Sequence, residues 1–218
     1  MKGQRYEVMQ MKIYDLQLGA LGANCYVIET GDSRCIAVDI GGDSERFLSF
    51  LKSKNLTLTK ILLTHGHFDH TGGAEAVRKA TGAEVFVHVD DAKMLQSAVD
   101  SLYTLIQLGE FAPVSEFIAV EEGCCITDGD CRITVIGTPG HSEGSVCYVC
   151  GNAMFTGDTL FCGSIGRTDF PGSNLLDMKN SLQKLYQMDK DFRIYPGHGE
   201  SSTLENEKRT NPYMRGFR

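Results

Sequence analysis

Four separate apolar segments of this chain each end in a side chain of the kind that binds metals. His65 follows the run 61–64, His141 follows 133–140, Asp158 follows 153–157 and His198 follows 193–197. Loops at strand ends are where a rigid scaffold can direct several side chains to one place. The pattern therefore predicts a fold built on sheets, with these four loops gathered at one edge.

The densest cluster is HGHFDH, residues 65–70. His65 and His67 are two residues apart, so on extended backbone both side chains point the same way and can reach one ion. Asp69 and His70 come where the chain turns into the next helix, and they can aim at a neighbouring ion. Imidazole and carboxylate suit Zn²⁺, Fe or Mn, whereas thiolates would indicate a closed structural zinc site. Since five of the six histidines belong to this strand-end set, metal binding is favoured over an unliganded polar loop.

Short apolar runs alternate with amphipathic segments, which predicts a mixture of strands and helices. Strands are expected at 12–18, 25–30, 35–41, 60–66, 84–89, 132–138, 145–150, 153–158 and 192–199. Helices are expected at 44–55, 74–82, 90–109 and 177–188, with Gly82 and Gly109 as C-terminal stops. No linker or repeat interrupts the pattern. We therefore expect one domain over residues 1–218, made of two sheets with helices outside them, and a loose N-terminal extension over residues 1–10.

Charge and hydropathy exclude several classes of partner. The net charge is −7 and there is no long run of Lys or Arg, so nucleic acid is not the expected partner. No apolar run approaches the roughly 18 residues needed to cross a bilayer. The N-terminal residues lack the apolar core of a signal peptide, so we expect a cytoplasmic protein without a membrane partner.

The eight cysteines do not form the pattern of a disulfide scaffold, because the chain is long and they are dispersed. Cys147 and Cys150 have CxxC spacing but lie on a predicted strand, where residues three apart point to opposite faces. We expect reduced and mostly buried thiols rather than a shared metal or redox pair.

Four motifs carry a resemblance to a known family: THGHFDH (64–70), GTPGHSEGSVCY (137–148), FTGDTLF (155–161) and YPGHG (195–199). In this order they resemble the metallo-β-lactamase superfamily. The resemblance implies an α+β fold, a four-layer αββα sandwich with the metal site at the edge of the two sheets. It also implies two divalent metal ions, with Zn²⁺ favoured over Fe or Mn. The implied ligands are His65, His67 and His141 for the first metal, Asp69, His70 and His198 for the second, and Asp158 as the bridge between them.

Two longer stretches, 157–173 and 197–214, look like the short glyoxalase II-like (hydroxyacylglutathione hydrolase-like) branch of the superfamily. Longer glyoxalase II enzymes carry a C-terminal helical domain that helps to bind glutathione. Only 20 residues follow His198 here, so no such domain is expected.

The implied chemistry is hydrolysis by a metal-bridging hydroxide. Two ions about 3.5–4 Å apart lower the pKa of a shared water to about 7 and polarise a carbonyl oxygen. A small-molecule thioester such as S-lactoylglutathione suits this site, since its thiol, with a pKa of about 8.5, leaves as a thiolate. Asp69 is a candidate proton shuttle, and Asp158 belongs with it to the candidate catalytic residues.

The main alternative is a persulfide dioxygenase-type oxidoreductase of the same fold, with a single iron. A β-lactamase is less favoured because no secretion signal is present.

Two further residues are candidates for supporting roles. Asp39 ends an apolar strand, and its carboxylate can orient a ligand histidine through the ring N–H; the alternative is a turn-forming Asp before two glycines. Arg167 lies shortly after Asp158 and can bind a substrate carboxylate with its forked guanidinium. Its alternative role is a structural ion pair with Asp169.

Overall fold

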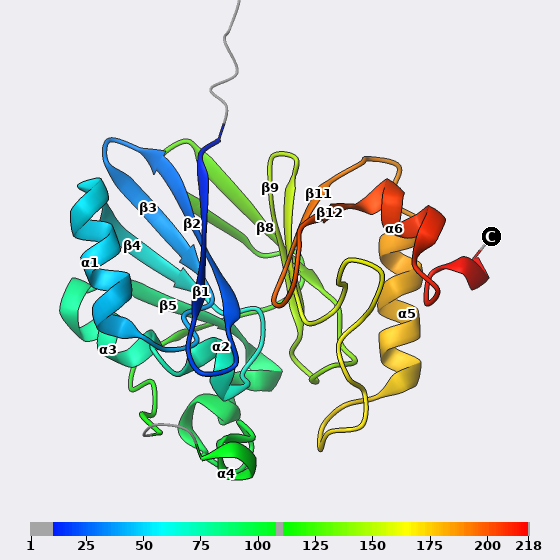
Figure 1. Cartoon of the computed structure of the whole chain (residues 1–218), viewed down its shortest axis with the longest axis horizontal. Helices are drawn as coiled ribbons and strands as arrows, with labels where there is room; N and C mark the ends of the chain where they lie inside the picture. Colours follow the sequence, from blue (N-terminus) through cyan, green and yellow to red (C-terminus); the bar gives the residue numbers. More distant parts are fainter. Residues whose placement is uncertain (1–10, 108–110, 218) are drawn as a thin grey trace, which may run out of the picture.

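The structure, a computed structural model, describes residues 11–107 and 111–217. Two six-stranded sheets lie face to face, and helices cover the outer face of each sheet (Figure 1). The expected four-layer αββα sandwich is therefore confirmed. The N-terminal extension expected over residues 1–10 lies outside the described residues.

The first sheet is mixed, with antiparallel pairing from β1 to β3 and parallel pairing from β3 to β6. In spatial order its strands are β1 (Ile13–Leu18), β2 (Ala23–Gly31), β3 (Arg34–Val38), β4 (Thr57–Leu62), β5 (Glu84–His88) and β6 (Ile118–Val120). The second sheet is antiparallel except where β10 pairs with β11. Its strands are β12 (Ser202–Thr203), β11 (Arg193–Pro196), β10 (Ala153–Gly157), β9 (Val146–Cys150), β8 (Cys131–Gly137) and β7 (Cys125–Asp128).

The longer helices form the two outer layers. Figure 1 shows α1 (Ser44–Lys54) and α3 (Ala74–Thr81) outside the first sheet, and α5 (Leu175–Tyr186) and α6 (Leu204–Thr210) outside the second. The expected stop at Gly82 is present, since this residue has φ +73° and its N–H donates to the Arg78 carbonyl. The shorter elements are α2 (Phe68–Thr71), α4 (Tyr103–Ile106) and the 3₁₀ helices η1 (Val89–Gln96) and η2 (Arg215–Phe217).

Three apolar clusters separate the four layers, and strand alternation distributes side chains between them. In β2, Cys25 and Val27 face the helices of the first sheet, whereas Tyr26 and Ile28 face the second sheet. The third cluster lies between the second sheet and α5 and α6. Burial of both faces explains why the central strands read as continuous apolar runs rather than alternating ones.

Cys147 and Cys150 lie on opposite faces of β9, as expected from their spacing. Cys147 packs against the helices of the second sheet and Cys150 packs between the sheets. All eight cysteines lie within the described residues and are free thiols. Four of the eight are buried, while Cys124, Cys125 and Cys162 are exposed.

The prediction of one helix over 90–109 is wrong. The 3₁₀ helix η1 ends at Gln96, and Leu102 has φ +64°, a left-handed conformation that stops helical continuation before the short α4. Asp91 lies in the first turn of η1 and is fully buried, and its carboxylate accepts hydrogen bonds from two distant loops. The expected stop at Gly109 lies outside the described residues.

Parallel pairing brings the functional loops to one edge of the sandwich. Because β3 runs parallel to β4, Asp39 and His65 follow the same end of the first sheet. Because β10 runs parallel to β11, Asp158 and His198 follow the same end of the second sheet. This shared direction, rather than proximity in sequence, positions the strand-end side chains.

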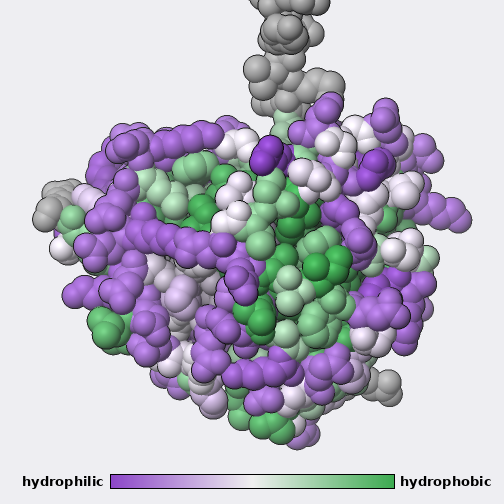
Figure 2. Space-filling view, turned by 180° about the vertical axis from the view of Figure 1, so that it is seen from behind, coloured by the Kyte–Doolittle hydropathy of each residue, from purple (hydrophilic) through white to green (hydrophobic). Residues whose placement is uncertain are grey.

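Seen from behind, apolar residues gather in one central area and hydrophilic residues surround it (Figure 2). Within the described residues, no helix combines the length and apolar character needed to cross a bilayer.

Phe155 tests the packing between the sheets. It is fully buried in β10, and its ring stacks on Tyr195 at 5.1 Å between centroids. We expect Phe155→Ala to lower the free energy of unfolding of the metal-free protein by about 3–5 kcal/mol, because a large cavity forms. Chemical denaturation measures this, with Leu175→Ala, 64% exposed, as a control that changes stability by about 0.5 kcal/mol or less. A loss for Phe155→Ala as small as that of the control would contradict the assigned packing.

Candidate metal centre

The seven side chains predicted as ligands come together at the common edge of the two sheets. His65 and His67 lie in the loop after β4, Asp69 and His70 lie in α2, and His141, Asp158 and His198 follow β8, β10 and β11. The buried members are His65, His67, His70, His141 and Asp158, while the His198 side chain is 30% exposed. The site is thus a nearly enclosed cluster with one open side.

The ligand atoms form overlapping groups in which all atoms lie within 4.8 Å of one another. The groups are His65, His67 and His141; His65, Asp69 and His70; and His70, Asp158 and His198. In the first group, His67 Nδ1 lies 2.9 Å from His141 Nε2. Such spacing suits several donors around one cation, so the edge of the sandwich offers more than one place for a metal ion.

The Asp158 carboxylate lies between the groups. Its Oδ2 is 3.5 Å from His141 Nε2, and its Oδ1 is 3.4 Å from His70 Nε2. Asp69 Oδ2 lies 3.4 Å from His198 Nε2 and 3.7 Å from His70 Nε2. Asp158 therefore faces both sides, whereas Asp69 belongs to the side of His70 and His198.

Hydrogen bonds at the outer ring nitrogens orient two of these histidines. The Nδ1–H of His141 donates to the Arg167 carbonyl at 2.8 Å, because a carbonyl can only accept. The His70 Nδ1–H donates to Asp39 Oδ2 at 2.9 Å. Each bond leaves the Nε2 lone pair directed into the cluster, which is the usual arrangement of metal-binding histidines.

His65 is oriented through Thr64. The Thr64 hydroxyl donates to Asp39 Oδ2 at 2.7 Å, so it accepts from the His65 Nδ1–H, 3.1 Å away. Asp39 Oδ1 accepts from the Thr64 backbone N–H at 2.8 Å. One carboxylate thus fixes the ring of His70 directly and that of His65 through a hydroxyl. Asp39 is thus placed as its candidate role of orienting a ligand histidine requires. Thr64 was missed because a threonine at a strand end is not in itself a functional signal.

Buried polar atoms without partners fit a metal at this place. Within the described residues, His65 Nε2 and Asp158 Oδ1 are buried at the cluster and make no hydrogen bond. Each such atom costs about 1–3 kcal/mol unless something binds it. Gly197 keeps the space open, since a Cβ there would lie 2.2 Å from Asp158 Oδ1 and 2.7 Å from His70 Cε1. The donor set of imidazole and carboxylate suits divalent metal ions.

Burial keeps the His65 and His67 rings neutral. Burial and the neighbouring imidazole of His141 lower the pKa of His67 to about 3, against an opposing effect of Asp69. Burial, followed by the nearby imidazoles, lowers the pKa of His65 well below its usual range. Neutral imidazole is the form that binds metal, so these rings need lose no proton first.

The electrostatics of the His70 side are different. Burial disfavours the charged ring, but the carboxylates of Asp69, Asp158 and Asp39 outweigh it and raise the pKa of His70 to about 10. For Asp69, charged neighbours again outweigh burial. Burial raises the pKa of this carboxyl group, but the His70 and His198 rings have the larger effect and hold the pKa well below its usual range. Without metal, this side is a charged pair, and a cation has to displace the His70 proton.

Asp91 joins two ligand loops and was missed as a functional residue. Its Oδ2 accepts from the Gly66 N–H at 2.8 Å and from the Ser142 hydroxyl at 2.6 Å, and its Oδ1 accepts from the Gly144 N–H at 2.7 Å. Gly66 lies between His65 and His67, and Ser142 follows His141. The signal that was available is its position three residues after the end of β5, comparable to that of Asp39 after β3 and Asp158 after β10.

Arg167 forms the ion pair named as its alternative role. Its Nε and Nη2 donate to the two carboxylate oxygens of Asp169, both at 2.9 Å, and both side chains are about two-thirds exposed. The guanidinium also lies 4.2 Å from the ring centroid of Phe170, beside the metal cluster. Binding of a substrate carboxylate by Arg167 stays a prediction.

A sequence model of the metallo-beta-lactamase superfamily matches residues 18–198. The chain belongs to this superfamily. The resemblance inferred from the four motifs is therefore confirmed over most of the chain.

Relatives of this superfamily chain match it along nearly their whole length. The probable metallo-hydrolase YqgX of Bacillus subtilis (strain 168) is 32% identical over 210 residues, covering 95% of this chain and 99% of the relative. Hydroxyacylglutathione hydrolase GloC of Haemophilus influenzae is 31% identical over 210 residues, covering 94% and 98%. The crystal structure of TTHA1623 in a di-iron-bound form has a TM-score of 0.83 and 34% identity, covering 92% of this chain and 99% of that one. These relatives support a metal-dependent hydrolase and leave the identity of the metal open.

Thr64→Val tests the link between Asp39 and His65. The substitution keeps the shape of the side chain but removes the hydroxyl, so we expect affinity for Zn²⁺ to fall by about 10–100-fold. Competition with a chromophoric chelator measures the affinity. Thr64→Ser is the matched control because it retains the hydroxyl, and equal affinity of the Val and Ser variants would contradict the link.

The charge on His70 is testable without activity. The raised pKa predicts that His70 is an imidazolium at pH 8 in metal-free protein, while His67 is neutral. Because the folded pKa lies above the usual 6.5, this charge stabilises the metal-free fold fully below pH 6.5, and the contribution is lost as pH rises toward 10. Long-range ¹⁵N NMR of the histidine rings reports the protonation states. A neutral His70 at pH 8 would show that the three carboxylates do not govern its proton.

Proposed function

We propose that the protein is a dinuclear metal-dependent hydrolase that cleaves a small-molecule thioester, as glyoxalase II-like enzymes do. The observation that carries the proposal is the position of Asp158, whose carboxylate lies 3.5 Å from His141 Nε2 on one side and 3.4 Å and 3.8 Å from the Nε2 atoms of His70 and His198 on the other. A carboxylate so placed suits the bridge between two cations. The proposed ligands are His65, His67 and His141 on one side and Asp69, His70 and His198 on the other.

The chain's own residues have separable roles in this proposal. When bound, two divalent ions supply a water with a pKa lowered to about 7 and a Lewis acid for a carbonyl oxygen. Asp158 would hold the two sides together. Asp69, whose carboxylate pKa is held below its usual range, would accept a hydrogen bond from the attacking water and pass on its proton. Asp39 would keep His65 and His70 in the binding tautomer.

The surroundings suit a substrate with a reactive carbonyl. A cavity of about 310 Å³ reaches His67, Asp69, His141 and Asp158, and its other walls are mainly apolar. Leu102 and Phe170 are two of these walls, and the Phe170 ring lies 5.9 Å from that of His67. Apolar walls limit the access of bulk water to a reacting carbonyl and strengthen the electrostatic interactions there.

A persulfide dioxygenase-type reaction on a single iron is the second candidate. It stays a candidate because a relative's structure contains iron, although that structure holds two irons rather than one. The groups around both sides of Asp158 favour the hydrolase instead, since a single iron would leave one side unused.

Metal counting and paired assays on the purified protein separate the candidates. We expect about two metal ions per chain and release of free thiol from a thioester, with loss of activity on chelation and recovery on Zn²⁺, Fe²⁺ or Mn²⁺ addition. Asp158→Ala should lower kcat/KM by about 100-fold or more, because it removes a proposed metal ligand. Removal of a residue that only supports a ligand costs about 10–100-fold, and the loss of a ligand should exceed this. Asp189→Ala, an exposed acid away from the cluster, is the matched control.

Two outcomes would overturn the proposal. One is a single iron per chain with oxygen uptake on a persulfide and no thioester cleavage. The other is an Asp158→Ala protein that turns over a thioester as fast as the Asp189→Ala control.

A further inference from the structure

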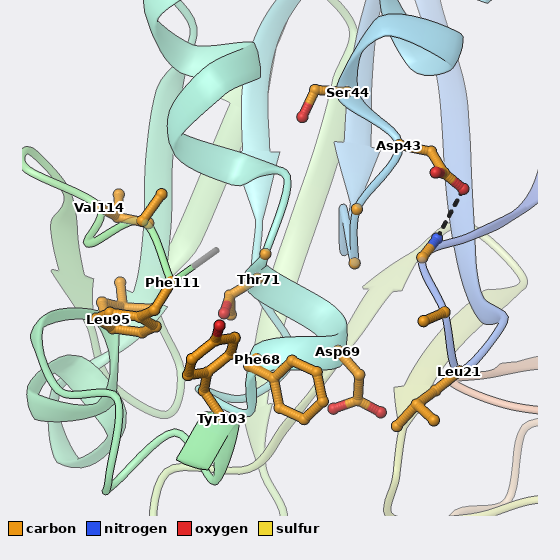
Figure 3. A pocket seen from close by; sticks show the side chains of 16 residues that line it. Leu21, Asp43, Ser44, Phe68, Asp69, Thr71, Leu95, Tyr103, Phe111 and Val114 are labelled. Carbon is orange, nitrogen blue, oxygen red and sulfur yellow. Dashed lines mark hydrogen bonds between the residues drawn. The ribbon is translucent and has the colours of Figure 1, made fainter. Parts of the chain in front are cut away.

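Beside the cavity at the metal cluster lies a second cavity, and of the proposed ligands Asp69 lines both. This cavity, of about 400 Å³, shares Leu21, Phe68 and Asp69 with the cavity at the metal cluster. We call it the side groove; Figure 3 shows it between the side chains of Leu95, Tyr103, Phe111 and Val114 on one side and the turn that carries Leu21 on the other. A substrate whose carbonyl lies at the cluster can therefore extend into the side groove past Asp69.

One wall of the side groove is aromatic and begins at the metal-binding segment. The ring of Phe68, next to Asp69, lies 6.0 Å from that of Tyr103, which lies 5.7 Å from that of Phe111. Behind these rings lie the buried side chains of Leu95 and Val114. The rings are half-buried, so they present apolar faces to anything that lies in the groove.

The opposite wall is the turn between β1 and β2, and both walls are held in place. The Gly19 N–H donates to Asp43 Oδ2 at 3.0 Å, which ties the turn to the start of α1 (Figure 3). On the aromatic side, the Val114 N–H donates to the Leu95 carbonyl at 3.0 Å. The groove is therefore formed before a ligand arrives, and its volume lies in the usual range of about 300–1,000 Å³ for ligand pockets.

The charges of the two cavities do not suit an acidic substrate arm. Among the described residues that line them, Arg167 is the one Lys or Arg, and its guanidinium is paired with Asp169. The side groove itself contains the carboxylates of Asp43 and Asp69. A peptide-like thiol such as glutathione carries two carboxylates, and Arg167, already paired with Asp169, is the one cationic side chain among the described lining residues that they would meet, so their desolvation cost would be high.

We propose that the substrate is an acyl thioester whose acyl group is an uncharged hydrocarbon chain that lies in the side groove. The proposal rests on the proposed function and refines its substrate class. We assign the hydrocarbon to the acyl arm because cellular carrier thiols bear amide or charged groups. In the reaction, the water oxygen bonds to the carbonyl carbon, the C–S bond breaks, and the products are a carboxylic acid and a thiol that takes up the remaining proton.

A series of N-acetylcysteamine thioesters from acetyl to decanoyl tests the proposal on the metal-loaded protein. We expect kcat/KM to rise with chain length by up to about fourfold per methylene until the groove is filled. S-Lactoylglutathione should be cleaved more slowly than the best member of the series. A flat or falling series, or S-lactoylglutathione as the fastest substrate, would overturn the proposal.

Ala112→Glu places a charge in the groove without touching the metal cluster. Ala112 is exposed and lines the side groove, so the substitution should not disturb folding. We expect kcat/KM for the octanoyl thioester to fall by about tenfold or more while that for the acetyl thioester stays unchanged, because only the longer chain meets the carboxylate. Ala76→Glu, on the exposed side of α3, is the matched control. An equal effect on both thioesters would contradict the assignment of the groove.

Binding provides a readout independent of turnover. The thioether S-octyl-N-acetylcysteamine cannot be hydrolysed, and its binding by calorimetry should show a negative heat-capacity change that shrinks in the Ala112→Glu protein. Cleavage of the acetyl thioester without chain-length dependence would refute the groove assignment and leave the hydrolase proposal standing. No cleavage of any thioester would refute the hydrolase itself.

Discussion

The carboxylate of Asp39 is the constraint on which the rest of the site depends. It lies at the end of β3 with φ +54°, and it holds the His70 ring directly and the His65 ring through Thr64. In the proposed assignment these two rings bind different metal ions, so a single buried acid would fix the tautomers of both. The parallel pairing of β3 and β4 places Asp39 beside Thr64, and the topology of the first sheet thereby sets the geometry of the metal site.

The second sheet supplies the opposite half of the cluster by the same principle. Asp158 and His198 follow the parallel strands β10 and β11, and Gly197 allows the backbone to approach the Asp158 carboxylate closely. Asp91 then joins the loop of His65 and His67 to the loop of His141. The ligands thus come from several loops, but buried hydrogen bonds tie these loops to one another, which is how a site on loops attains the precision that metal binding needs.

Much of this arrangement could be predicted from the sequence, because metal-binding side chains at strand ends are a strong local signal. The family, the layered fold and the convergence of the seven side chains followed from such signals. The supporting residues did not, because their roles depend on contacts between distant segments. Thr64 acts through its neighbour's ring and through Asp39, and Asp91 falls near the start of the helix expected over 90–109, where an Asp is common for purely local reasons. The short strands β6, β7 and β12 have too few residues to show a period. The side groove is lined by several separate stretches of the described chain, between Gly19 and Val114, and no local pattern encodes it.

Diffraction from crystals of the zinc-loaded protein at the zinc absorption edge tests the central claim most directly. We predict two anomalous peaks about 3.5–4 Å apart, one among His65, His67 and His141 and the other among Asp69, His70 and His198, with Asp158 between them. A single peak, or peaks away from these seven side chains, would contradict the account.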